Sequence, residues 1–129
     1  MKKHKARNKK EKFFYLKNIF LILTEIFKFS TNNFEQIIAS LKKPIATWDC
    51  HLDTIFILKK TTRLLDFLNI KSCFLRSIIL FKMLKKYNLN PKLHIGVKKV
   101  DSLESHAWIE INKTSIDTSK GYEILTTIE

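Results

Sequence analysis

The sequence predicts an α+β fold in which helices come first and an antiparallel sheet follows. Before Asn88, apolar residues recur at spacings of three and four, which is typical of helices packed on one face. From Pro91 onward, apolar and polar residues alternate, which is typical of half-buried strands. Helices and strands that are segregated along a chain in this way favour the α+β class.

The chain of 129 residues fits one domain, and with only two glycines and two prolines it is too poor in both for a linker-rich protein. We expect a tail over residues 1–12 and a single domain over residues 13–129, with helices in 13–87 and strands in 92–128. The tail has seven basic residues and one acidic residue, a composition typical of disordered segments.

The first helix is expected in the strongly apolar segment 13–29. Lys17, Glu25 and Lys28 interrupt the segment, and it is shorter than the ~20 residues that span a bilayer. We therefore expect an amphipathic helix packed on the domain through Leu16, Ile19, Phe20, Leu23, Ile26 and Phe27. A helix that docks on a membrane surface or on a partner is the alternative, which the preceding basic tail favours.

Three more helices are expected before the sheet. A short one over 34–41 follows a possible cap in 31–33, and a longer one over 51–68 follows possible caps in 47–49. The segment 72–87 is apolar around most of its circumference, as in a helix at the centre of a domain. We expect this central helix to pack on the sheet.

The strands are expected around 93–97 and 107–111, followed by a return strand from Thr114 and a short last element over 122–128. Asn112 and Lys113 form the turn between the second strand and its return. If the turn has only these two residues, Ile111 faces Thr114 and Trp108 faces Asp117.

One combination of residues has the chemistry of a catalytic site: Cys73, His106 and Asp117. The two-residue turn places His106, Trp108 and Asp117 on one face of the sheet, with Trp108 lining the site, whereas a slip of one residue would separate them. Cys73 stands at the entry to the central helix, where unpaired N–H groups and the helix dipole favour a thiolate.

The roles in such a site follow from the chemistry of acyl transfer. Cys73 attacks an acyl carbon, His106 takes and returns the proton, and Asp117 orients the imidazole. The backbone N–H of Cys73 meets the oxyanion. Judged by spacing alone, an inert buried cysteine, a structural histidine and a turn aspartate fit the same pattern.

Other candidate sites are weaker. Cys50, His51 and Asp53 are neighbours in sequence, so a helix would fan them apart. His94 lies opposite to the apolar face of its strand and is expected on the surface. No cysteine or histidine pair has metal-ligand spacing, and two glycines do not make a phosphate loop. We expect neither a metal nor a cofactor.

The net charge of +12 favours acidic partners such as nucleic acid, a membrane surface or an acidic peptide. No nucleic-acid-binding motif or aromatic stacking platform is recognisable, so nucleic acid is not expected. The two cysteines and the lack of a convincing secretory signal point to the cytoplasm, with free thiols. Peripheral contact with a membrane through the basic amphipathic N-terminus stays open.

Four blocks in order resemble a known family, the transglutaminase-like cysteine peptidases of lasso-peptide biosynthesis. The blocks are Cys73-Phe74-Leu75-Arg76-Ser77, Leu93-His94-Ile95-Gly96-Val97, Ser105-His106-Ala107-Trp108-Ile109-Glu110 and Asp117. The resemblance covers roughly 55–125. Phe74 stands where leucine is commoner, and Asn112-Lys113 stands where a turn with glycine is commoner.

The resemblance implies a transglutaminase-like or papain-like fold, with Cys73 on the central helix against a sheet that carries His106 and Asp117. It also implies the reaction, removal of the leader from a ribosomally made precursor before an ATP-dependent cyclase closes the ring. A separate leader-binding protein is implied as a partner, because the chain is too short for a fused leader-binding domain.

Two other classes of function stay open beside the peptidase. One is a catalytically silent scaffold subunit of a peptide-maturation complex. The other is a basic protein that binds a membrane surface or nucleic acid, in which the cysteine and histidine are incidental. Thiol reactivity separates the peptidase from the silent scaffold, because a catalytic Cys73 reacts faster than Cys50.

Overall fold

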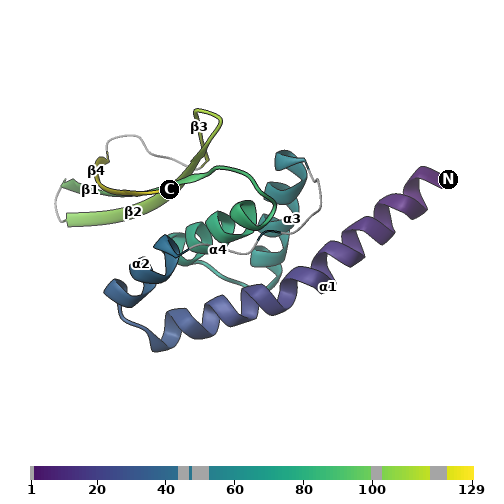
Figure 1. The fold of residues 1–129 in the computed structure, drawn as a ribbon, viewed down its shortest axis with the longest axis horizontal. Coiled ribbons are helices and arrows are strands. Elements are labelled where there is room, and N and C mark those ends of the chain that lie inside the picture. The colour runs from purple at the N-terminus through teal and green to yellow at the C-terminus, as the bar shows by residue number, and fades with distance from the viewer. Residues whose placement is uncertain (1, 44–46, 48–52, 100–102, 117–121) are drawn as a thin grey trace.

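The computed structural model describes residues 2–43, 47, 53–99, 103–116 and 122–129. The helices are α1 (Lys2–Thr31), α2 (Phe34–Lys42), α3 (Thr54–Phe67) and α4 (Cys73–Lys86), and the strands are β1 (Lys92–Lys99), β2 (Leu103–Ile111), β3 (Thr114–Ile116) and β4 (Glu123–Ile128). Figure 1 shows this order of helices followed by a sheet, which confirms the predicted α+β class.

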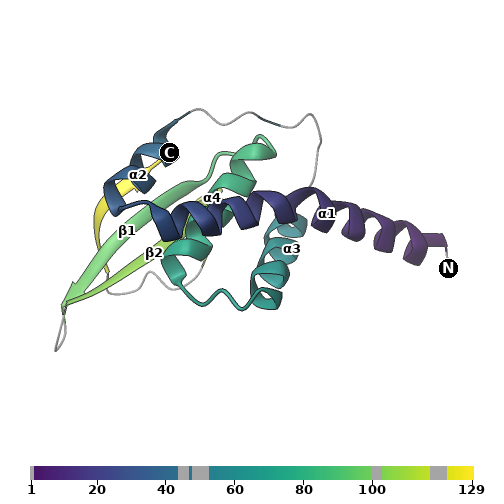
Figure 2. The ribbon, with the colours of Figure 1, turned by 90° about the horizontal axis from the view of Figure 1, so that it is seen from below.

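The strands form one antiparallel sheet in the order β3-β2-β1-β4. Helix α4 lies between this sheet and α1, and it contacts β1, β2, α1 and α3 (Figures 1 and 2). Nine of its fourteen residues are buried, so it is the central helix that the sequence predicts. The core lies between α4 and the inner face of the sheet, which presents Leu93, Ala107 and Ile109.

Helix α1 packs through a different face from the predicted one. Its buried residues are Phe14, Asn18, Ile22 and Glu25. Four of the residues expected in the core are exposed instead, namely Leu16, Phe20, Leu23 and Phe27, while Ile19 and Ile26 are half-buried. The prediction of this face was wrong because the helix is apolar on two opposite sides, and periodicity does not say which side packs.

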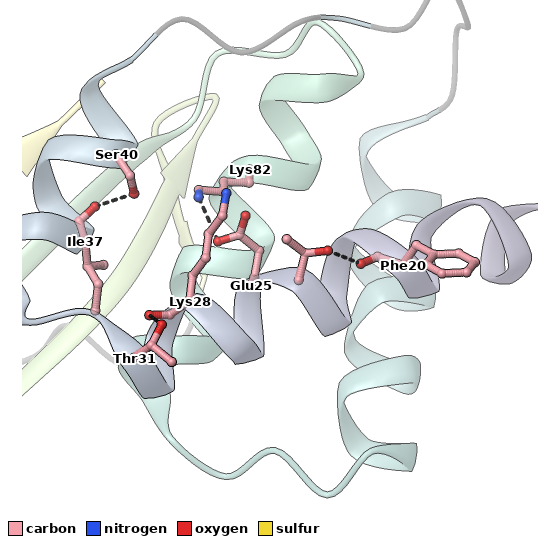
Figure 3. Close-up of polar contacts among 8 residues, drawn as sticks. Phe20, Glu25, Lys28, Thr31, Ile37, Ser40 and Lys82 are labelled. Carbon is pink, nitrogen blue, oxygen red and sulfur yellow. Dashed lines mark hydrogen bonds and ion pairs between the residues drawn. The ribbon is translucent and has the colours of Figure 1, made fainter.

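The packed side of α1 is hard to recognise in the sequence because two of its residues, Asn18 and Glu25, are polar. The Asn18 side-chain amide donates to the Phe14 carbonyl at 2.8 Å and to the Tyr87 hydroxyl at 3.1 Å. Glu25 pairs with Lys82 of α4 at 2.7 Å, with both side chains about nine-tenths buried (Figure 3). These partners make a buried amide and carboxylate acceptable in the core.

The residues at the start of α1 were expected to form a tail. The helix begins at Lys2, so the basic segment supplies its first turns. The N-terminal half of α1 projects away from the rest of the molecule (Figures 1 and 2). The division into a tail over residues 1–12 and a domain over 13–129 stays a prediction.

The predicted boundaries of the second and fourth helices are within one residue of those of α2 and α4. Asn33 caps α2 by accepting from the Gln36 N–H at 2.8 Å, and the Gln36 side chain accepts from the Asn33 N–H at 3.0 Å. This reciprocal pair is a capping box. Helix α3 begins at Thr54, later than expected, and the caps proposed at Trp48 and Asp49 lie outside the described residues.

The turn between β2 and β3 has the two residues that the sequence predicts. Ile111 pairs with Thr114, and the φ angles of Asn112 and Lys113 are 52° and 63°. Two left-handed residues in a two-residue loop define a type I′ turn, whose twist matches that of the flanking strands. The strand register on which the proposed site depends is therefore confirmed up to Ile116.

No helix in the described part of the chain has both the length and the apolar character needed to cross a membrane.

Candidate active site

Cys73 is the first residue of α4 and carries a free, half-buried thiol. Ser72 caps the helix: its Oγ accepts from the Leu75 N–H at 3.3 Å, and its carbonyl accepts from the Arg76 N–H at 3.0 Å. These two bonds satisfy the third and fourth N–H groups of the helix. The first two, on Cys73 and Phe74, have no acceptor inside the helix and lie beside the thiol.

Arg76 holds the loop that leads into Cys73. Its Nη1 atom donates to the Ile70 carbonyl at 2.8 Å and pairs with Asp66 Oδ1 at 2.9 Å. The guanidinium therefore ties the first turn of α4 to the end of α3. This contact fixes where α4 begins, and with it the position of Cys73.

Ser77 links the helix of Cys73 to the strand of His106. Its Oγ donates to the Ala107 carbonyl at 3.1 Å, and this bond is buried. Ser77 lies about one turn after Cys73, and Ala107 is the neighbour of His106 in β2. One hydrogen bond thus sets the distance between the two elements that carry the candidate catalytic residues.

A pocket of about 320 Å³ is lined by both Cys73 and His106. Its other lining residues are mainly apolar: Phe34, Phe74, Ile95, Val97, Ser105, Ala107 and Leu125. Phe74 stacks on Phe34 at 5.6 Å between ring centroids, so the residue that departs from the family pattern also closes this pocket. The pocket suits an apolar group next to the thiol.

A second hollow, of about 640 Å³, also has Cys73 in its lining. It is more polar, with Thr62, Asp66, Asn69 and Arg76 among its lining residues. Cys73 therefore borders both an apolar pocket and a more polar hollow. An extended chain that crosses the thiol would meet both.

The imidazole ring of His106 packs among aromatic residues. It stacks on Trp108 at 5.9 Å with 20° between the planes, and it contacts Tyr122 at 4.9 Å. Side chains alternate along β2, so His106 and Trp108 lie on the face away from the one that presents Ala107 and Ile109 to α4. The structure thus places Cys73 and His106 in the lining of one pocket. The His106 ring, however, lies against Trp108 on the face of the sheet away from α4, so the ring and the Cys73 thiol are not brought together.

Gly96 makes room for the Trp108 ring. It pairs with His106 across β1 and β2, and a Cβ atom at this position would lie 2.7 Å from the Glu123 carbonyl and 2.9 Å from Trp108 Cη2. Only glycine allows so close an approach. The Ile-Gly-Val block therefore has a physical reason here: it lets Trp108 lie flat beside His106.

His94 is buried, contrary to the prediction that it lies on the surface. Only 7% of it is exposed. Its Nδ1 atom lies 2.9 Å from Thr127 Oγ1, and its ring lies 5.5 Å from that of Trp108. The prediction failed because the side chains of Thr127 on β4 and Trp108 on β2, the two strands that flank β1, lie beside the His94 ring.

The remaining predicted site residues divide into two groups. Trp108 is 3% exposed and lies beside His106, as strand parity predicts. Asp117, Cys50 and His51 lie outside the described residues. The pairing of β2 with β3 is as predicted up to Ile116, and Asp117 is the next residue of the chain.

In the sequence, Arg76 and Ser77 stand out only as parts of a block that resembles the family. Their functions, holding the loop before Cys73 and joining α4 to β2, appear only in the structure. A signal was available in the sequence: an arginine and a serine in the otherwise apolar first half of α4 each need a polar partner when buried. The identity of that partner depends on tertiary contacts.

A cysteine at the start of a central helix, beside an antiparallel strand that carries a histidine, defines a candidate thiol-dependent acyl-transfer site. The model of the family described as the transglutaminase-like superfamily matches residues 49–129. The chain belongs to this superfamily, which includes cysteine peptidases. The search of curated proteins and the search of solved structures each give no match.

Proposed function

We propose that this protein is a cysteine peptidase that removes the leader from a lasso-peptide precursor. The observation that carries the proposal is the apolar pocket lined by both Cys73 and His106, between a helix and a strand joined through Ser77. The family supports thiol chemistry at this place, and the four-block resemblance supports the narrower substrate.

In the proposed reaction, the thiol of Cys73 attacks the carbonyl carbon of the bond between leader and core. His106 takes the thiol proton and gives it to the leaving amine of the core peptide, which leaves the leader as a thioester on Cys73. Water, deprotonated by His106, then releases the leader. Asp117 orients the imidazole throughout.

The oxyanion of each tetrahedral intermediate is placed at the start of α4. The backbone N–H of Cys73, with that of Phe74 beside it, donates to this oxygen, because neither group has an acceptor inside the helix. Proton transfer requires the His106 imidazole to leave its contacts with Trp108 and Tyr122 on the outer face of the sheet and to reach the thiol. Catalytic hydrogen bonds commonly tighten only when substrate is bound.

The two hollows beside Cys73 bind different parts of the substrate. The apolar pocket takes an apolar side chain next to the scissile bond, and the polar hollow takes the polar backbone and side chains on the other side. A separate leader-binding protein delivers the precursor, and an ATP-dependent cyclase uses the released core. The reaction is placed in the cytoplasm.

Cleavage of a purified precursor, with and without a leader-binding protein, tests the proposal. Cys73→Ala and His106→Ala should each lower kcat by about 10³-fold or more, and Asp117→Asn by about 10²-fold to 10⁴-fold. Cys50→Ala is the matched control and should cleave like the wild type. Cleavage retained in Cys73→Ala would overturn the mechanism.

Alkylation by iodoacetamide, followed by mass spectrometry, separates a peptidase from a catalytically silent scaffold. A nucleophilic Cys73 should be alkylated faster than Cys50 in the folded chain, and at the same rate in denaturant. Equally slow reaction of both thiols in the folded chain would favour the scaffold.

A further inference from the structure

The exposed side of α1 carries a row of large apolar side chains. The exposed fractions are 72% for Leu16, 77% for Phe20, 48% for Leu23 and 67% for Phe27. Their spacings of four, three and four residues place them on one face, opposite to the buried Phe14, Asn18, Ile22 and Glu25. We call these four exposed residues the apolar row, and it extends along about 16 Å of helix.

The charges around the apolar row are all of one sign. Between Lys12 and Thr31 the only acidic residue is Glu25, and its carboxylate is buried against Lys82. The cations at Lys12, Lys17 and Lys28 flank the row. Toward the N-terminus the same helical positions, spaced by three and four, are occupied by Lys2, Lys5, Lys9 and Lys12. At these positions the sequence is therefore basic in the N-terminal part of the helix and apolar in the rest.

A basic hollow lies beside the C-terminal end of α1. Lys28, Lys43, Lys82 and Lys86 line it together with Ser40 and Glu25, and its volume is about 310 Å³. Figure 3 shows Lys28 extending toward the Glu25–Lys82 pair, with Ser40 on the neighbouring helix. Glu25 offsets only one of the four lysines, so the hollow has a net positive charge and attracts anions.

We propose that the apolar row docks α1 on an anionic lipid surface. A helix with leucine and phenylalanine on one side and lysine around them lies in the plane of a bilayer, with its apolar side chains among the acyl chains and its cations at the phosphates. Lys12 and Lys28, which flank the row and are exposed, then contact lipid phosphates at its two ends. This inference does not depend on the proposed peptidase activity.

A second copy of the chain fits the apolar row less well. The row covers about two heptads, fewer than the three or four that sustain a coiled coil. Pairing two copies would also bring together two chains of net charge +12. An anionic lipid surface instead neutralises the same cations.

The test is sedimentation of the full chain with phosphatidylcholine vesicles that contain about one third phosphatidylglycerol. We expect binding to these vesicles, about tenfold or more weaker binding to pure phosphatidylcholine, and loss of binding as salt rises. The double variant Phe20→Ser/Phe27→Ser should bind the anionic vesicles about tenfold or more weakly. Both side chains are exposed, so circular dichroism should show an unchanged fold.

Phe67→Ser is the matched control, because Phe67 is 81% exposed on α3, away from the row. It should bind vesicles like the wild type. Equal binding of wild type and double variant overturns the proposal, as does an equal loss in Phe67→Ser. Light scattering without lipid gives a further check: a wild-type dimer that the double variant converts to a monomer would assign the row to a second copy instead.

Discussion

Lys113 is a lysine at a position where the backbone favours glycine. Its φ of 63° and that of 52° at Asn112 make both turn residues left-handed, a conformation that asparagine tolerates and a lysine adopts at a cost. The register at the turn is fixed from the side of β2, where Ile109 and Ile111 are buried. The strain is thus borne by one residue so that β2 and β3 stay aligned.

Lys113→Gly should therefore stabilise the protein by about 0.5–1 kcal/mol. Thermal or urea unfolding measures the change. Asn112→Gly is the control, with a smaller gain, because asparagine already accepts a positive φ. Destabilisation by Lys113→Gly would mean that the lysine side chain contributes more than the backbone strain costs.

Gly96 offers a second prediction at the residue scale. Gly96→Ala places a methyl group 2.7 Å from the Glu123 carbonyl and 2.9 Å from Trp108 Cη2, so the Trp108 ring or β4 must shift. We expect a loss of about 1–3 kcal/mol in unfolding free energy and a changed tryptophan fluorescence. If both quantities stay at wild-type values, Trp108 has more freedom than its contacts suggest.

At the scale of elements, the sequence predicts helices and strands better than it predicts their partners. The change from helical spacing to alternation locates the sheet, and Asn112-Lys113 locates the hairpin. Helix α1 shows the limit: it has two apolar faces, and the packed one contains Asn18 and Glu25. Their partners, Tyr87 and Lys82, are more than fifty residues away in the chain, so only the tertiary structure identifies them.

The Glu25–Lys82 pair joins α1 to α4. Glu25→Leu or Lys82→Met alone leaves the other charge buried and should cost about 3–5 kcal/mol, measured by urea unfolding. The double variant Glu25→Leu/Lys82→Met should recover most of that loss. Lys92→Met is the surface control, because Lys92 forms an exposed ion pair with Glu129 at 3.4 Å. This substitution should cost less than about 1 kcal/mol. Additive losses in the double variant would rule out coupling between the two helices through this pair.

The Ser77 hydroxyl joins α4 to β2. Ser77→Ala leaves the buried Ala107 carbonyl without this donor and should cost about 1–3 kcal/mol. If the proposed peptidase activity holds, cleavage should fall further than stability explains, because the spacing of Cys73 and His106 depends on this bond. Ser40→Ala is the control: its hydroxyl bonds the Ile37 carbonyl within α2, away from the site. Wild-type cleavage by a destabilised Ser77→Ala variant would show that the bond serves stability alone.

At the scale of the molecule, the candidate site depends on contacts among separate elements. The sequence places Cys73 at a helix start and His106 on a strand, and both positions hold in the structure. Their common pocket needs Phe34 from α2 and Leu125 from β4 as well, and no local pattern links these residues. Sequence patterns therefore identify the candidate residues, whereas the pocket that these residues share depends on the assembled fold.

The functions proposed for the N-terminal part of α1 and for the apolar pocket should also be separable by experiment. The N-terminal half of α1 projects away from the sheet and α2, between which the apolar pocket lies (Figure 1). Deleting residues 1–12 removes seven basic residues and one acidic residue. Cleavage of a soluble precursor, if the proposed activity holds, should stay within about twofold of the wild type at physiological salt. Binding to anionic vesicles should weaken by about tenfold or more, because each lysine near the surface contributes. A deletion variant that keeps vesicle binding but loses affinity for a leader-binding protein would reassign the basic segment from lipid to that partner.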